Sequence, residues 1–265
     1  MKDLTLTRFI FILDQFESTQ YVVRRLVEAG YCVYQLEYGI GFGGLFMGLG
    51  DMRHSAHEVQ SWVAEVLSST GADKVDMIGY SEGSVVMMYY IKQLDGDRFV
   101  HSAVGVAPGL HGTTLHGYTD LLRAVGPFCV ACVQLMPNST FLQDLYKKDG
   151  QFSAGPKDNR LDSRRPLAKS GPRYMMLMTN QDDIITPYTS GILDGEDATN
   201  VVLEEICPTA TQGRWPPLRD LDKSPFLPAL VLNHIRIMYS PVTFAIVDSF
   251  LDPTSARATL DCNSS

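Results

Sequence analysis

Long apolar segments are missing from this sequence. A helix that crosses a membrane needs about 18 or more consecutive apolar residues. The richest stretch, 226–251, is interrupted by Asn233, His234, Arg236 and Asp248. We therefore expect no transmembrane segment.

Basic residues are scarce as well. The chain of 265 residues carries 22 Lys and Arg against 30 Asp and Glu, which gives a formal charge of −8. Because no basic patch stands out, we expect no nucleic-acid partner, and a strongly anionic membrane surface is disfavoured. A neutral or apolar substrate fits this charge better.

Cysteine is also rare, with only five in the chain. They are too few to hold a fold of this size together, and their odd number leaves at least one unpaired or paired elsewhere. The Cys129-x-x-Cys132 pattern is compatible with a redox pair, half of a zinc site or a local disulfide. Since no second CxxC and no histidine pair at ligand spacing accompanies it, we expect a structural disulfide or ordinary packing and no metal site.

The elements that are present alternate as in an α/β protein. At this length, with 45% hydrophobic residues, the chain can bury one sizeable core, so we expect one domain over 1–265. Hydrophobic periodicity predicts strands and helices in alternation, which favours a mostly parallel sheet covered by helices on both faces. The expected strands are 9–13, 31–36, 75–78, 99–107, 173–178 and 201–206, and the expected helices include 55–67, 85–94 and a last one that begins at Pro241. The helix 55–67 should turn Ala56, Val59, Trp62, Val63 and Val66 inward.

A long insertion separates two of these strands. Residues from about 108 to 172 show only short helical patches, such as 141–148. We expect this insertion to form the rim or the lid of a pocket.

The most informative motif is Gly79-Tyr80-Ser81-Glu82-Gly83, between the strand 75–78 and the helix 85–94. Strand, Gly-x-Ser-x-Gly and helix together are typical of a nucleophile elbow, a turn so tight that it needs small residues at both glycine positions. The helix N-terminus would stabilise the negative charge that develops in acyl transfer. The alternative is that Ser81 is only a turn residue.

A serine nucleophile needs a histidine base and an acid that orients it. Asp182 follows the strand 173–178, and of six histidines only His234 comes after both the elbow and this acid. The order Ser81, Asp182, His234 is the one that α/β-hydrolases use. The alternative is that His234 lies at a core boundary without a catalytic role. His54 and His57 are expected at the surface or its boundary.

A glycine-rich loop at 38–50 carries large apolar side chains. It lacks the pattern of a phosphate-binding loop. Phe42, Leu45 and Phe46 suit a wall for an acyl chain. Packing of this loop on its own core is an equally good explanation.

Together these segments resemble the class 2 triacylglycerol lipases, which are secreted α/β-hydrolases. The matching segments are 31–34 with Tyr38-Gly39, 50–53 with Ser55-Ala56, 70–76, 79–83, 107–108 with 111–114, 182–188, Cys207-Pro208 and His234. The resemblance implies an α/β-hydrolase fold and hydrolysis of neutral lipid esters by Ser81, Asp182 and His234, with Asp182 rather than Asp183 as the acid. It also implies transient contact with a lipid interface, and no cofactor is needed.

The chain departs from this family around the oxyanion hole. The family's first strand ends in His-Gly-Thr, where this chain has Asp14-Gln15. The expected backbone donors are the amides of Glu82 and Gln15, and the loss of one such donor costs about 2.7 to 4 kcal/mol. Asp14 and Glu82 add acids near this position, Tyr80 and Ser84 replace His and Gly, and 208–228 looks like an insertion.

The resemblance implies an extracellular protein, but a signal peptide is not evident. The apolar run 9–13 is short and lacks a cleavage pattern, so we expect a buried strand there. A truncated start and a cytosolic relative are both compatible with this. The acceptor patterns at Asn138 and Asn263 are weak evidence for secretion.

The sequence therefore predicts a lipid-ester hydrolase that forms an acyl-enzyme on Ser81. Two alternatives stay open. One is a catalytically impaired relative that binds lipid or a protein partner, and the other is an esterase or acyltransferase for short acyl groups.

Overall fold

The computed structural model describes residues 9–13, 20–40, 48–147, 171–195, 198–210, 232–254 and 262. Six strands in this part form one sheet in the order β2-β1-β3-β4-β5-β6, and every neighbouring pair is parallel. Their bounds are β1 Phe9–Leu13, β2 Cys32–Leu36, β3 Val75–Tyr80, β4 Val100–Val106, β5 Arg173–Met178 and β6 Ala198–Val202. From β1 the sheet grows to β2 on one side and to β3 on the other, so the strand order reverses between β1 and β3. In open parallel sheets, sites form beyond the carboxyl ends of the strands at such a point.

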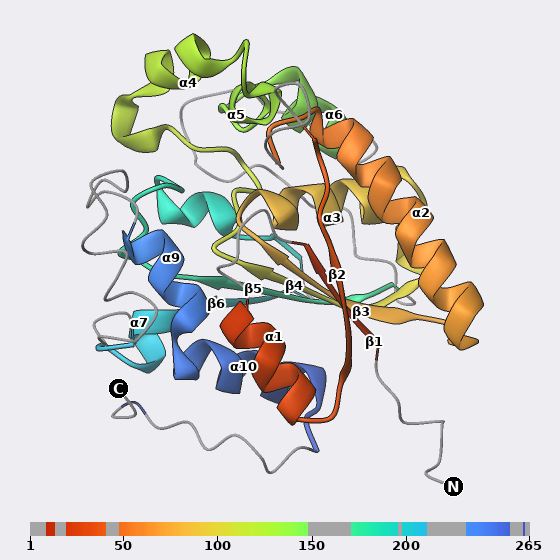
Figure 1. The fold of residues 1–265 in the computed structure, drawn as a ribbon. Helices are drawn as coiled ribbons and strands as arrows, with labels where there is room; N and C mark the ends of the chain where they lie inside the picture. The colour runs from red at the N-terminus through yellow and green to blue at the C-terminus, as the bar shows by residue number, and fades with distance from the viewer. Residues whose placement is uncertain are drawn as a thin grey trace, which may run out of the picture.

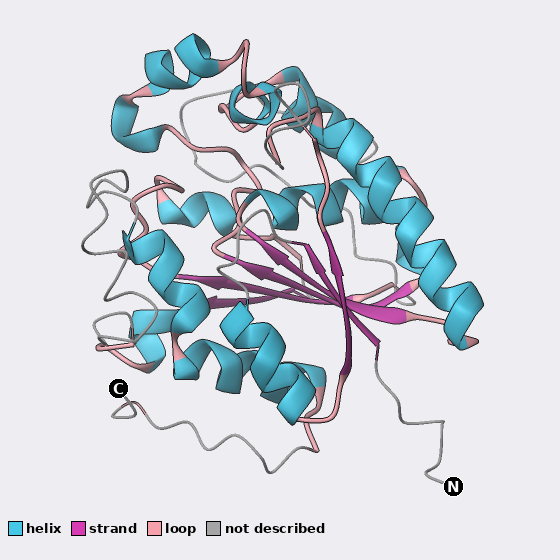
Figure 2. Ribbon diagram, in the orientation of Figure 1, coloured by secondary structure: helices cyan, strands magenta, loops and turns pink. Residues whose placement is uncertain are grey.

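Helices cover both faces of the sheet (Figure 2). Figure 1 shows α2 and α3 on one face, with α1 and α10 on the other. The described helices are α1 Gln20–Glu28, α2 Met52–Thr70, α3 Glu82–Gln93, α4 Thr119–Val125, α5 Val130–Gln134, α6 Thr140–Tyr146, α7 Leu203–Ile206, α9 Leu232–Tyr239 and α10 Pro241–Leu251, with 3-10 turns η4 Gly96–Arg98, η5 Leu115–Gly117 and η7 Tyr188–Gly191. This layering is the predicted α/β architecture.

Strand β3 is buried on both faces, as a central strand of a covered parallel sheet must be. Its side chains alternate between two cores. Met77 joins the core under α2 and α3, and Ile78 joins the core under α1, α9 and α10. The strand that carries the elbow is therefore held from both sides of the sheet.

The sequence predicts the last strand over 201–206, and both of these boundaries are wrong. β6 begins at Ala198 and ends at Val202, and residues 203–206 form the helix α7 instead. Glutamate disfavours strands and favours helices, and in α7 the carboxylate of Glu204 accepts hydrogen bonds from the Thr179 hydroxyl (2.6 Å) and the Asn180 amide (2.9 Å). The turn also buries Leu203 completely.

The helix α2 is longer than predicted and turns one residue outward that we expected inside. Val59, Val63 and Val66 are buried, but Trp62 is 41% exposed. Trp62 lies about 100° around the helix from Val63, at the edge of the buried stripe. The apolar face therefore follows the valine spacing and excludes the indole.

The insertion between β4 and β5 is more helical than the sequence indicates. Its described part contains η5, α4, α5 and α6, and Figure 1 shows α4 and α5 above one end of α3. The segment 148–170 lies outside the described residues. The Val130 amide, at the start of α5, donates to the Leu49 carbonyl at 2.9 Å, so the insertion is tied to the end of the glycine-rich loop.

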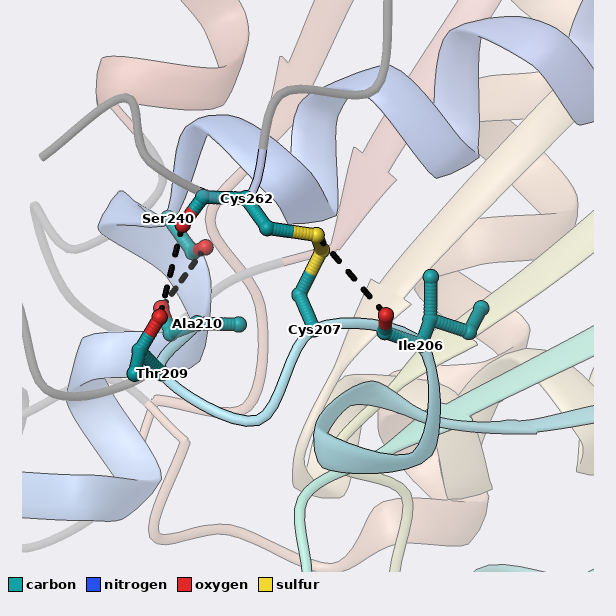
Figure 3. The surroundings of a disulfide bond; sticks show 6 residues. All are labelled: Ile206, Cys207, Thr209, Ala210, Ser240 and Cys262. Carbon is teal, nitrogen blue, oxygen red and sulfur yellow. Dashed lines mark hydrogen bonds between the residues drawn. A yellow bond between two sulfur atoms is a disulfide. The ribbon is translucent and has the colours of Figure 1, made fainter.

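The described residues form two disulfides. Cys129 pairs with Cys132 at the start of α5, as one of the sequence-based alternatives predicts. Cys207 pairs with Cys262, which fastens the segment after α7 to the C-terminal part of the chain (Figure 3). Beside this disulfide the Ser240 hydroxyl donates to the Ala210 carbonyl at 3.0 Å. Cys32 is an exposed free thiol.

No helix in the described ranges combines the length and the apolar character that a membrane crossing requires.

Candidate active site

Ser81 lies at the sharp turn between β3 and α3. Its backbone has φ 53° and ψ −121°, a conformation that L-residues rarely adopt and that is typical of a nucleophile elbow. The turn is fixed by its neighbours, because the Ser81 amide donates to the Val106 carbonyl at 2.9 Å. A Cβ on Gly79 would lie 2.6 Å from both the Cα and the nitrogen of Ser84, so only glycine allows β3 and α3 to approach this closely.

The histidine that the sequence selects meets this serine. His234 Nε2 lies 2.8 Å from Ser81 Oγ, and the imidazole is buried, with His234 only 5% exposed. His234 belongs to the first turn of α9, and it precedes the last helix, α10, which begins at Pro241 as predicted. A helix supports the ring more rigidly than a loop would.

Asp182 completes the arrangement from the loop after β5. Both of its carboxylate oxygens lie 2.9 Å from His234 Nδ1. Because a carboxylate only accepts, Nδ1 carries the proton and Nε2 is left to accept from the Ser81 hydroxyl. Oδ1 also accepts from the amides of Ile184 (2.9 Å) and Ile185 (2.8 Å), which fix the rotamer of the acid.

The neighbouring acid, Asp183, holds a different part of the same histidine. Its Oδ1 accepts from the backbone amide of His234 at 3.1 Å, and its Oδ2 from that of Asn233 at 3.2 Å. Burial raises the pKa of the Asp183 carboxyl, and the two amide hydrogen bonds oppose this shift. Asp182 therefore contacts the ring of the histidine, and Asp183 contacts its main chain.

The loop that carries both acids is pinned to the segment that follows β4. The buried hydroxyl of Thr113 donates to the Ile184 carbonyl at 2.5 Å and accepts from the Thr186 amide at 3.0 Å. Thr114 adds a bond from its amide to the Thr186 carbonyl at 2.8 Å. The His-Gly-Thr-Thr segment thus sets the register of the acid loop.

His111, in the same segment, is a structural histidine. Its Nε2 donates to the Ile192 carbonyl at 3.0 Å, and its Nδ1 is buried without a hydrogen-bond partner among the described residues. Burial lowers the pKa of His111 to about 4, and the positive charge of Lys92 adds to the shift. The ring is therefore neutral at physiological pH.

The predicted oxyanion donors are only partly covered by the structure. Glu82 is the first residue of α3, so its backbone amide lies at the positive end of this helix, directly after Ser81. Its side chain is buried, with the residue 6% exposed. Gln15 and the neighbouring Asp14 lie outside the described residues, and so do Phe42, Leu45 and Phe46 of the predicted acyl wall.

Metal ligands do not gather anywhere in the described ranges. No group of three or more His, Cys, Asp or Glu side chains there could hold a metal ion. His54 and His57 lie on the exposed side of α2, where His54 Nε2 is 3.7 Å from Glu58 Oε1. The chemistry that the described site can perform is that of a serine, a histidine and a carboxylate.

Sequence analysis missed one residue of the site. The Tyr80 hydroxyl donates to the His234 carbonyl at 3.0 Å, and the two rings lie 5.2 Å apart between centroids. The elbow motif marked Tyr80 as a departure from the lipase pattern but gave no partner for it. The only feature of the sequence that points to this contact is a tyrosine hydroxyl in the residue directly before Ser81.

Comparison with known proteins gives a family. A model of the family described as Lipase (class 2) matches residues 14–165, more than half of the chain. No curated protein matches the chain at the level of sequence.

Among solved structures, Aspergillus fumigatus lipase B has a TM-score of 0.63 at 17% identity, over 96% of this chain and 56% of that one. Bacillus licheniformis lipase BlEst2 in its mature form has a TM-score of 0.59 at 12% identity, over 92% of this chain and 91% of that one. In its propeptide form, BlEst2 has the same TM-score and identity, over 98% of this chain and 53% of that one. The chain thus spans little more than half the length of the Aspergillus lipase. These similarities identify the α/β-hydrolase fold.

Proposed function

The chain belongs to the class 2 lipase family, and from this premise we propose that it hydrolyses carboxylic esters of neutral lipids with Ser81 as nucleophile, His234 as base and Asp182 as the acid that orients it. Membership in a lipase family supports ester hydrolysis as the general chemistry. One observation carries the finer proposal: the 2.8 Å contact of His234 Nε2 with Ser81 Oγ, at an elbow where Asp182 holds Nδ1.

In the acylation step, Ser81 Oγ attacks the ester carbonyl carbon while His234 Nε2 takes the hydroxyl proton. The Asp182 carboxylate stabilises the imidazolium that forms. The tetrahedral intermediate collapses as His234 gives the proton to the leaving alcohol oxygen, which leaves an acyl-enzyme on Ser81. A water molecule, deprotonated by His234, then releases the fatty acid.

The developing oxyanion needs backbone donors. We propose the Glu82 amide as the first donor, because it begins α3 beside Ser81, and the Gln15 amide as the second. Asp14 and the Glu82 carboxylate would add negative charge near this oxygen. Phe42, Leu45 and Phe46 are proposed to contact the acyl chain, and the chain's charge of −8 favours a neutral lipid and transient contact with a neutral interface.

A fluorophosphonate probe tests the nucleophile directly. We expect Ser81 in the purified protein to be labelled, and both Ser81→Ala and His234→Ala to abolish labelling. Turnover of p-nitrophenyl esters should fall by at least about 10⁴-fold in the same variants. Circular dichroism and size exclusion establish that the variants fold. A folded wild-type protein that neither labels nor turns over substrate would refute the proposal and favour a lipid-binding relative.

Substrate class needs a separate measurement. A chain-length series of esters should favour long acyl groups, and release of free acid should exceed transfer to added alcohol. A preference for short acyl groups would indicate an esterase, and dominant transfer an acyltransferase. We expect EDTA to leave turnover unchanged, because no step in this mechanism uses a metal.

We also propose that the chain matures in an oxidising compartment, as an exported protein would. The pairs Cys129–Cys132 and Cys207–Cys262 support this, since such bonds persist outside the reducing cytosol. Non-reducing peptide mapping of protein from its native source should recover both linked peptides. Recovery of four reduced thiols would contradict it.

A further inference from the structure

We infer that Tyr80 and Asp183 are positioning residues that together hold the main chain of His234, so that its ring reaches both Ser81 and Asp182. This main-chain clamp, defined as the Tyr80 hydroxyl and the Asp183 carboxylate, rests on the proposed function, because it acts through the base.

The need for a clamp follows from what Asp182 can and cannot fix. Two oxygens at 2.9 Å from Nδ1 determine how the imidazole is rotated. They do not determine where the Cα of His234 lies. Catalytic geometry has little tolerance, and a displacement of about 1 Å can reduce the rate about 100-fold.

Asp183 fixes the amide side of His234. Its carboxylate accepts from two successive amides in the first turn of α9, those of Asn233 (3.2 Å) and His234 (3.1 Å). These amides belong to the turn whose N–H groups have no partner within a helix, so a carboxylate from another segment can cap them and also oppose the positive end of the helix dipole. The capping residue directly follows Asp182, so ring and backbone are held by one short loop.

Tyr80 fixes the carbonyl side. Its hydroxyl donates to the His234 oxygen at 3.0 Å, and the residue is only 5% exposed. Tyr80 is the last residue of β3 and directly precedes Ser81, so the base is tied to the strand that carries the nucleophile. His234 is thus held at its amide by Asp183, from the loop after β5, and at its carbonyl by Tyr80, from the end of β3.

The first test separates the clamp from general stability. We expect Tyr80→Phe, which removes only the hydroxyl, to lower kcat by about 3- to 10-fold with KM changed less than about twofold, as for the loss of one neutral hydrogen bond. The rate of fluorophosphonate labelling should fall in parallel, since labelling reports the chemical step. An unchanged kcat with an altered KM would overturn the role of Tyr80.

The second test uses a graded series at Asp183. An asparagine keeps one acceptor oxygen and loses the other, whereas alanine loses both. We expect kcat to follow the order wild type, then Asp183→Asn, then Asp183→Ala, with the alanine variant about 10- to 100-fold below wild type. A kcat for Asp183→Asn between those of wild type and Asp183→Ala would show that catalysis depends on the hydrogen bonds from the Asn233 and His234 amides to residue 183. Equal kcat in all three proteins would overturn the role of Asp183, and if the alanine variant does not fold, the asparagine variant alone decides.

Tyr31→Phe is the matched control. Tyr31 is also buried and donates its hydroxyl to the Asp248 carboxylate at 2.9 Å, but it lies where β2 begins, whereas Ser81 lies at the other end of the parallel strands, where β3 ends. We expect this variant to lower the Tm and leave kcat and labelling unchanged. A loss of kcat equal to that of Tyr80→Phe would mean that any lost buried hydroxyl perturbs the site, and the clamp would be refuted.

The wild-type protein distinguishes the two proposals. If Ser81 labels and the variants at Tyr80 and Asp183 behave as wild type, only the clamp is wrong. If Ser81 in folded wild-type protein does not label, the proposed function fails and the clamp falls with it.

Discussion

His111 should make the fold sensitive to acid, and His111→Gln should remove much of that sensitivity. The histidine donates from Nε2 to the Ile192 carbonyl, and its ring centroid lies 5.3 Å from that of Tyr146. The Lys92 ammonium lies over the same Tyr146 ring, 4.7 Å from its centroid. A proton on Nδ1 would therefore be buried without an acceptor and near a second positive charge. Glutamine removes the titrating group and keeps an amide donor for the carbonyl.

The magnitude follows from linkage. The pKa of His111 is lowered from 6.5 to about 4 in the folded protein. Between these values the unfolded chain binds a proton that the folded chain excludes, so the free energy of unfolding falls as the pH drops. At 1.36 kcal/mol per pKa unit, the loss between pH 7 and pH 4 is about 3 kcal/mol.

Urea unfolding at pH 7, 5.5 and 4 measures this difference. We expect the free energy of unfolding of the wild type to fall by about 3 kcal/mol more than that of His111→Gln over this range. At pH 7 the variant should be the less stable of the two, because it loses the imidazole packing on Tyr146. His54→Gln, at an exposed position on α2, is the control and should retain the wild-type slope. Parallel pH dependence in wild type and His111→Gln would refute the argument that His111 is held neutral.

Four further substitutions test the elbow and the disulfides. Gly79→Ala should abolish labelling of Ser81 and cost about 1–3 kcal/mol or more, because its Cβ would meet the backbone of Ser84; labelling at the wild-type rate would contradict this. Ser84→Ala, which removes a 2.7 Å hydrogen bond to the Gly79 carbonyl, should cost about 1 kcal/mol in urea unfolding and retain labelling. Loop-closure entropy predicts a loss of up to about 4 kcal/mol for Cys262→Ser and about 2 kcal/mol for Cys132→Ser, because the closed segments span sequence separations of 55 and 3; a larger Tm loss for the second would contradict the entropic argument.

The sheet and the elbow were predictable because their signals are local. An apolar run before Gly79 and a segment rich in Met and Tyr after Gly83 indicate strand, turn and helix without any distant contact. The strand at 173–178 has the same kind of signal and its predicted bounds match β5. The expectation of one domain over the whole chain stays a prediction.

Where local signals conflict, the sequence misleads. Val201 and Val202 favour a strand, but the glutamates that follow them favour a helix, and the structure ends β6 between the two pairs. The decisive contact is that of Glu204 with the end of β5, which is distant in sequence. The hydrophobic periodicity of residues 201–206 gives no indication of this contact.

The pair Asp182-Asp183 shows a limit of another kind. The two adjacent acids have the same residue type, and only the resemblance to the lipase family selects Asp182 as the partner of the imidazole. The chemistry of the two residues gives no reason why Asp183 should meet the backbone of His234. In a loop, adjacent side chains diverge, so a shift of one residue would exchange their partners. The register is set by Thr113, whose hydroxyl bonds to the Ile184 carbonyl and the Thr186 amide across about 70 residues of chain. The roles of the two acids therefore depend on a contact between the segments after β4 and β5, which only the folded sheet brings together.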